Sequence, residues 1–188
     1  MATSTTGRVN ALIFEETKLR NAFVIQPERK EDHRGYFART FCQEEFAAQG
    51  LKTQFVQSSV SFNKTRGTLR GMHFQMAPRE ETKLIRCTRG AICDVIIDLR
   101  PDSPTYKQHL AVTLSAENGA MLYVPEGFAH GFQTLEDATE VFYQMTEFFA
   151  PELARGLRWD DPAFGISWPE VETRIILDRD RNYPSFRD

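Results

Sequence analysis

The chain has 188 residues, of which 41% are hydrophobic and 26% charged, and its formal net charge is −3. These values are typical of one globular domain with a sizeable core, and they exclude the strongly basic surface of a nucleic-acid-binding protein. Residues 1–10 lack the apolar stretch of a signal peptide, and no apolar run is long enough to span a membrane, so we expect a cytoplasmic protein.

The first element predicted along the chain is a short helix over residues 42–51 that ends at Gly50. From about Phe55 onward, short apolar segments alternate with turn signals, which is typical of an antiparallel β-sandwich or barrel. Residues 83–99 hold two β-rich runs around Arg89-Gly90 and predict a hairpin, whose second strand ends before Pro101 because proline has no amide hydrogen.

The segment that follows repeats this plan. Residues 109–132 predict a strand, a turn at Asn118-Gly119, a second strand and then a bend at Pro125 and Gly127. Another strand is predicted within residues 139–151, a single turn of helix over 160–166, and an irregular polar tail over 176–188. Since no internal repeat or linker interrupts the chain, we expect a single domain over residues 1–188 with a core of about 24–186.

The three cysteines, Cys42, Cys87 and Cys93, are odd in number and have no CxxC spacing. The pattern favours neither a disulfide framework nor a zinc site. We expect these residues to be small buried hydrophobic side chains.

His73 stands in the apolar and aromatic run LRGMHFQ and admits three interpretations: a core histidine, a metal ligand or a base. In a regular strand His73 and Gln75 face one side and Arg70 the other. A metal site on a β-barrel usually needs an H-x-H pair, but the second position here is Gln75, and His130 is the one other histidine that we expect to come near. His33 and His109 lie in polar surroundings. A metal is therefore not predicted, and the other two interpretations stay open.

Two further side chains are candidates for chemistry. Tyr143 would share a strand face with Val141 and Met145 and point toward the core or a pocket, where its hydroxyl needs a partner. Lys83 and Arg70 stand at strand margins, where the simplest interpretation is a solvated edge charge.

Longer strings carry more information. They are DHRGYFARTF, FVQSSVSFNKTRGTLRGMHFQ, KLIRCTRGAICDVIIDLRPDSPTY, VPEGFAHGF, EVFYQMTEFFAPE and LRWDDPAFGISWP. These strings resemble the dTDP-4-dehydrorhamnose 3,5-epimerase family, and the resemblance runs from about Val24 to Phe186. It implies an all-β, cupin-type jelly roll with a few short helices. It also implies a homodimer in which N-terminal strands contribute to the partner's sheet and site.

Members of that family act on a nucleotide-linked 4-keto-6-deoxyhexose and invert the carbons beside the ketone. Such a reaction needs a base, an acid on the opposite face and support for the enolate oxygen, but no redox or metal cofactor. The resemblance implies that His73 is the base, Asp180 its carboxylate partner, Tyr143 the acid and Lys83 the cation beside the C4 oxygen. Asp178 competes with Asp180, because Leu177 stands where the family usually has a serine.

The resemblance also implies a set of substrate-binding residues. Arginines would hold the diphosphate, His130 would lie near the sugar, and polar and aromatic side chains would contact the nucleotide. The set is Arg34, Phe37, Arg39, Gln57, Ser59, Arg70, His130 and Phe149.

Some positions depart from the family pattern. Ser58-Ser59 replaces Asp-Asn, Phe148-Phe149 replaces a Tyr-Tyr pair, and Arg39 replaces an acidic residue. If Arg39 meets the base edge, its guanidinium suits the acceptors of cytosine better than the N3–H of thymine, which favours a CDP or GDP sugar over a dTDP sugar. The alternative is that Arg39 faces solvent or phosphate. A rival activity is inversion at C3 alone. Two other functions are disfavoured: a metal-dependent cupin would need the H-x-H pair that this sequence lacks, and a non-catalytic sugar-binding module would not need the acid, the base and the lysine.

Overall fold

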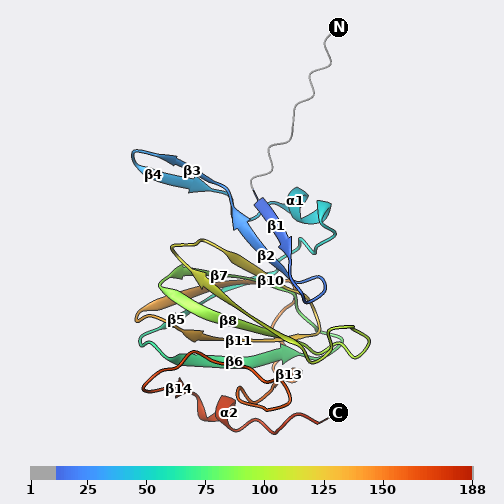
Figure 1. Ribbon diagram of the computed structural model, residues 1–188. Helices are drawn as coiled ribbons and strands as arrows, with labels where there is room; N and C mark the ends of the chain where they lie inside the picture. The colour runs from blue at the N-terminus through green and yellow to red at the C-terminus, as the bar shows by residue number, and fades with distance from the viewer. Residues whose placement is uncertain (1–11, 188) are drawn as a thin grey trace.

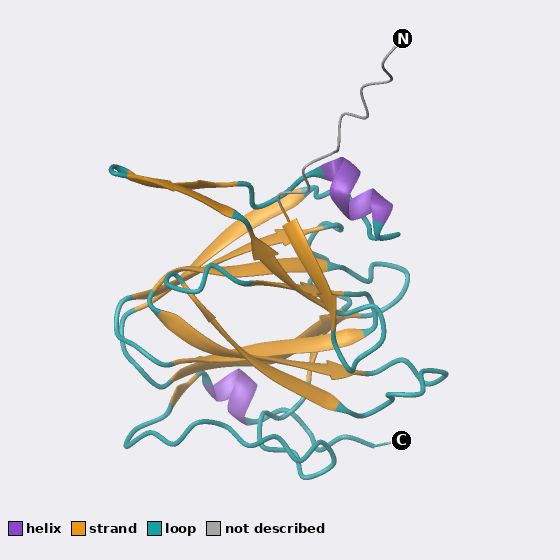
Figure 2. Cartoon of the chain, turned by 45° about the horizontal axis from the view of Figure 1, so that its top comes forward, coloured by secondary structure: helices purple, strands orange, loops and turns teal. Residues whose placement is uncertain are grey.

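The computed structural model describes residues 12–187, so the expectation for residues 1–10 lies outside the described part of the chain. Two facing antiparallel sheets make up the body of the molecule, as Figures 1 and 2 show. The first sheet has the order β1 (Leu12–Glu16), β2 (Phe23–Pro27), β10 (Met121–Val124), β7 (Lys83–Arg89), β12 (Thr139–Met145), β5 (Gln57–Asn63). The second has the order β13 (Ala154–Gly156), β6 (Thr68–Gln75), β11 (Phe128–Thr134), β8 (Ala91–Asp98), β9 (His109–Ser115), and β14 (Ile175–Ile176) pairs in parallel with β6. The predicted all-β jelly roll is confirmed.

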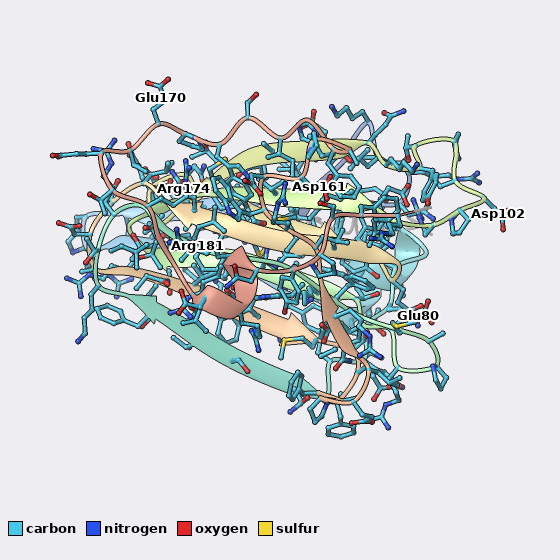
Figure 3. The ribbon with its side chains drawn as sticks, turned by 90° about the horizontal axis from the view of Figure 1, so that it is seen from below. Glu80, Asp102, Asp161, Glu170, Arg174 and Arg181 are labelled. Carbon is cyan, nitrogen blue, oxygen red and sulfur yellow. The ribbon has the colours of Figure 1, made fainter. Side chains whose placement is uncertain are left out.

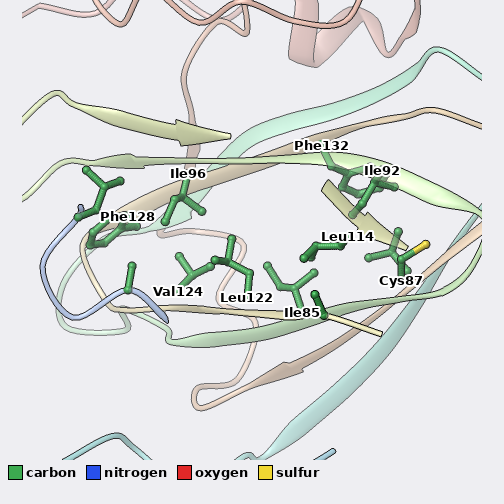
Figure 4. Packing of buried hydrophobic residues seen from close by; sticks show 13 residues of the cluster. Ile85, Cys87, Ile92, Ile96, Leu114, Leu122, Val124, Phe128 and Phe132 are labelled. Atoms are coloured by element: carbon green, nitrogen blue, oxygen red, sulfur yellow. The ribbon is translucent and has the colours of Figure 1, made fainter. Parts of the chain in front are cut away.

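The main core fills the space between the two sheets (Figure 4). Strand alternation turns Ile85 of β7, Ile92 and Ile96 of β8 and Phe132 of β11 inward, and each is at most 1% exposed. Burying one such side chain stabilises the fold by roughly 1.5–3 kcal/mol. These side chains therefore hold the two sheets together.

The C-terminal segment covers the outer face of the second sheet (Figure 3). Leu157, Phe164 and Phe186 pack there with Met72 of β6 and Val95 of β8. Because β8 is covered on both faces, all eight of its residues are buried. The prediction of a wholly irregular tail was wrong, since β14 pairs with β6 and helix α2 (Asp178–Arg181) follows it. Pairing with an existing strand supplies the hydrogen bonds that this polar sequence could not supply alone.

The two predicted hairpins were also wrong, although their strands are present. β7 pairs with β10 and β12, whereas β8 pairs with β9 and β11, so the chain crosses from one sheet to the other at Gly90. The same crossing occurs between β9 and β10 at Asn118-Gly119. Alternation in sequence identifies a strand and its buried face, but it does not identify the neighbour.

Two smaller elements lie outside the sandwich. Helix α1 (Gln43–Ala48) confirms the predicted helix, and its Phe46 is fully buried against the outer face of the first sheet. The hairpin of β3 (Arg29–Asp32) and β4 (Gly35–Ala38) projects away from the sandwich (Figure 1), and its Phe37 is 75% exposed. Within residues 12–187 neither helix is long and apolar enough to cross a membrane.

The expectation of buried cysteines is confirmed for Cys87 and Cys93 but not for Cys42, which is half-buried. Cys42, Cys87 and Cys93 are all free, and Cys87 and Cys93 are buried. Burial raises the pKa of both buried thiols to about 11, so they remain protonated and unreactive at neutral pH.

Candidate active site

A cavity of about 790 Å³ lies between β5, β7 and β12 of the first sheet and β6 and β11 of the second, with the segment around α2 at its side. Polar and aromatic side chains from all of these elements line it. They include His73, Lys83, His130, Tyr143 and Asp180, together with Gln57, Ser59, Arg70, Glu81, Phe149 and Arg179. Most of the predicted site residues are thus brought together in one place.

An irregularity in β6 places Arg70 and His73 on the same cavity wall. His73 is opposite His130 and Arg70 is opposite Phe132, so three steps along β6 match two along β11 and β6 holds one extra residue. Gly71 lies at this bulge with φ of +139°, and a Cβ there would lie 2.5 Å from the Cα of Gly131. Only glycine fits, and the expectation that Arg70 faces away from His73, which holds for a regular strand, does not apply.

His73 is paired with a carboxylate. Its Nε2 lies 2.8 Å from Oδ1 of Asp180, and the Asp180 side chain is only 4% exposed. The Gly71 amide donates to Oδ2 of Asp180, and the Arg179 Nε lies 3.3 Å from Oδ1. Burial alone would raise the pKa of Asp180, but the hydrogen bond and charge of His73, with Gly71 and Arg179, outweigh it and lower that pKa. An ionised carboxylate stabilises a protonated imidazole, which suits His73 to accept a proton. Of the two competing aspartates, the structure places Asp180, not Asp178, against His73.

A second histidine–aspartate pair lies beside the first. His130 Nε2 is 2.7 Å from Oδ1 of Asp94, with side chains 6% and 0% exposed. Oδ2 of Asp94 has no hydrogen-bond partner within the described residues. Sequence reasoning missed Asp94, although a charged residue inside the apolar run AICDVIID was the signal that could have found it.

Tyr143 lies on the opposite wall, on β12. Its ring centroid is 6.1 Å from that of His130, and the two rings meet edge to face. Burial raises the pKa of the phenol, and the negative charge of Asp94 adds to the effect, while a hydrogen bond with Ser61 opposes it. The phenol is therefore protonated throughout the neutral range and is suited to donate a proton.

Lys83 is a wall residue of the cavity and not a solvated edge charge. Its Nζ lies 2.7 Å from Oε1 of Glu81, and both side chains are 12% exposed. Glu81 was not predicted, because in the charged stretch PREETK it resembles an ordinary solvent-facing residue.

Gln75 stands where an H-x-H metal-binding pair would have its second histidine, and its side chain has a structural role. Its amide holds the segment that carries Phe149, donating to the Phe148 carbonyl and accepting from the Ala150 amide. Gln57 accepts a 2.6 Å hydrogen bond from the Phe149 amide on the cavity side. No group of three or more His, Cys, Asp or Glu side chains within residues 12–187 is arranged to hold a metal ion.

Three predicted binding residues are not brought to this cavity by their own chain. Arg34 lies in the turn of the β3–β4 hairpin, Phe37 on β4, and Arg39 just after it. Arg34 pairs with Asp32 and is 78% exposed, and Arg39 lies 2.6 Å from Glu45. In the part of the chain that the structure describes, the cavity is lined without these three residues.

A jelly roll of two facing sheets with titratable side chains between them places the protein in the cupin-like class. The family model described as dTDP-4-dehydrorhamnose 3,5-epimerase matches residues 16–188. The chain belongs to this family, as the resemblance in its sequence predicted.

Individual relatives agree with the family. The dTDP-4-dehydrorhamnose 3,5-epimerase of Methanothermobacter thermautotrophicus is 45% identical over 177 residues, covering 93% of this chain and 95% of the relative. A crystal structure of the Bacillus anthracis enzyme with TDP and pyrophosphate bound has a TM-score of 0.90 and 41% identity, covering 94% of this chain and 100% of the other. The Legionella pneumophila dTDP-6-deoxy-D-glucose-3,5-epimerase in complex with dTDP-4-keto-L-rhamnose has a TM-score of 0.86 and 29% identity, covering 94% and 100%.

Proposed function

We propose that this carbohydrate epimerase inverts C3 and C5 of a dTDP-linked 4-keto-6-deoxyhexose by proton transfer on either side of the ketone. The observation that carries the proposal is the cavity itself, in which the His73–Asp180 pair and the protonated phenol of Tyr143 come from opposite sheets. Two proton-transfer groups on opposite walls can serve opposite faces of one sugar ring.

His73 removes the proton from a carbon next to the ketone. The electrons of that C–H bond form the C=C bond of an enolate, and the carbonyl π electrons move onto the C4 oxygen. The ammonium of Lys83 donates a hydrogen bond to this oxygen, where the negative charge develops. The C=C electrons of the enolate then form a new C–H bond with the proton of Tyr143 on the opposite face of the carbon, and the C4 carbonyl forms again. The phenolate takes a proton from water, and His73 gives its own proton to water. Repetition at the second carbon gives the doubly inverted sugar.

We propose dTDP as the nucleotide because the relatives bind it. The Bacillus anthracis structure holds TDP and the Legionella pneumophila structure a dTDP sugar. Arg39, the residue that favoured cytidine in sequence, is engaged by Glu45 in this chain and so supports the alternative in which it does not read a base. Competition binding of dTDP and CDP to the protein tests this assignment, and tighter binding of CDP would restore the cytidine hypothesis.

We further propose a homodimer in which the β3–β4 hairpin of one chain enters the cavity of its partner. The hairpin projects from the sandwich and carries Arg34 and the exposed Phe37 (Figure 1). An arginine and an aromatic ring exposed on a projecting hairpin suit a diphosphate and a base. The hairpin of a second chain would thus complete the substrate-binding set.

The experiment that tests the activity is solvent exchange. The protein is incubated in deuterated water with the dTDP-linked 4-keto-6-deoxy-D-glucose, and NMR counts the labelled carbons. Label at both C3 and C5 is expected. Label at C3 alone would show the mono-epimerase, and no label above that of a His73→Ala variant would overturn the proposal.

A further inference from the structure

Two carboxylates from residues 12–187 line the cavity, and the mechanism above gives a task to Asp180 but none to Glu81. Its Oε1 lies 2.7 Å from the Nζ of Lys83, and only 12% of its side chain is exposed. A short ion pair with this little solvent exposure is screened far less than a surface pair. It therefore restrains the ammonium of Lys83 in a way that an exposed pair would not.

The backbone that carries Glu81 is fixed on both sides. The Thr82 amide donates to Oγ1 of Thr146 at 2.9 Å, and the Thr146 amide donates to the Thr82 carbonyl at 3.1 Å. Gln75 donates to the Arg79 carbonyl at 2.8 Å. Glu81 is thus presented from a loop that is held between β6 and β12, and its carboxylate is a fixed point for a flexible partner.

Lys83 needs such a fixed point. Its four-carbon stem has many rotamers, whereas support for an enolate oxygen requires the ammonium at one place before the charge develops. The ammonium has three N–H donors, so one donor to Glu81 leaves two for the substrate. The carboxylate also offsets part of the positive charge, which acts against catalysis. Orientation is expected to outweigh this loss, because a misplaced donor stabilises the enolate little at any charge.

We propose that Glu81 is the positioning residue of Lys83 and through it sets the support of the C4 oxygen. This inference rests on the proposed epimerase activity. It assigns Glu81 no contact with the reacting carbons, so its loss should lower kcat and leave KM nearly unchanged.

The test compares Glu81→Gln with Glu80→Gln, a matched change at the half-buried neighbour outside this cavity. We expect Glu81→Gln to lower kcat for deuterium exchange about 10- to 100-fold with KM within about twofold, while Glu80→Gln behaves as wild type. Glu81→Asp, which keeps the charge, should recover part of the rate. Thermal unfolding should show that both glutamine variants stay folded at the assay temperature.

A double-mutant cycle gives a second readout. In a Lys83→Met background, Glu81→Gln should change the residual exchange rate less than about twofold, because its partner is already gone. A kcat for Glu81→Gln equal to or above that of wild type, or an equal effect with and without Lys83, would overturn the inference. Failure of the proposed function differs visibly, because the wild-type protein itself would then exchange no label.

Discussion

The Nε2 atom of His73 lies 2.8 Å from the Oδ1 atom of Asp180, although 107 residues separate the two in the chain. Asp180 lies on α2, and its carboxylate also accepts the amide of Gly71 from the bulge of β6. The same carboxylate therefore orients the ring of His73 and ties the C-terminal segment to the strand that carries this ring.

Replacing Asp180 by asparagine should leave the fold intact and remove the negative charge beside His73. The protonated imidazole is then no longer stabilised, so kcat for exchange at C3 and C5 should fall by about 10²–10⁴-fold. Asp178→Asn is the matched control, since Asp178 lies two residues away on α2 and is exposed. Equal effects of the two changes would mean that Asp180 does not support His73 as the base.

Replacing Tyr143 by phenylalanine should separate proton removal from proton return. His73 still removes the proton, so label still enters the sugar, but inversion at C5 slows because the opposite face has lost its donor. NMR of the recovered sugar measures label and configuration together. The raised pKa of Tyr143 adds a pH prediction: ionisation of this phenol should cause no loss of wild-type activity below about pH 10. Unchanged double inversion in the variant would exclude Tyr143 as the acid.

The proposed dimer predicts complementation between two defective chains. Arg34→Ala would damage the partner's site and His73→Ala the chain's own site. In a mixture produced by co-expression, half of the dimers are hybrids, and each hybrid has one intact site. About one quarter of wild-type activity should therefore return. Activity no higher than the average of the two pure variants would contradict a shared site.

Asp98 should make stability depend on pH in the acid range. It is fully buried, and burial alone would raise its pKa, but hydrogen bonds from Arg100, Ser103 and Thr105 outweigh this and lower the pKa to about 2. The unfolded value is about 3.9, so the ionised form stabilises the fold by on the order of 2 kcal/mol above about pH 4, and this contribution is lost as the pH falls to about 2.

Urea unfolding measures this contribution. Asp98→Asn should lower the free energy of unfolding at pH 7, and the difference from wild type should narrow as the pH falls to about 2. Asp102→Asn in the neighbouring exposed turn is the control. A difference that does not change with pH would mean that the charge of Asp98 is not what stabilises the loop.

The sequence predicted the strands of this fold better than their partners. Pro101 and the Asn118-Gly119 turn mark where strands end, and both signals act locally. The choice between sheets at Gly90 depends on contacts with strands far away in the chain, which no local pattern encodes. The jelly roll itself followed from the resemblance to a family.

The candidate site also has residues that the sequence predicted and residues that it did not. His73, Lys83, Tyr143 and Asp180 were predicted from the resemblance and line one cavity, although their roles remain proposals. Glu81 was missed because its burial is a product of the folded loop and leaves no mark in a charged stretch of sequence.

The pairing of distant strands has a consequence for how the molecule forms. Gln57 of β5 pairs with Met145 of β12, and every strand that pairs with β6 comes later in the chain. Such non-local pairs must close long loops before they gain any stabilisation, so we expect refolding on the order of milliseconds to seconds rather than microseconds. A nascent chain that ends just after β8 would present this apolar strand with its later neighbours β9 and β11 still missing, and would be the species most exposed to aggregation.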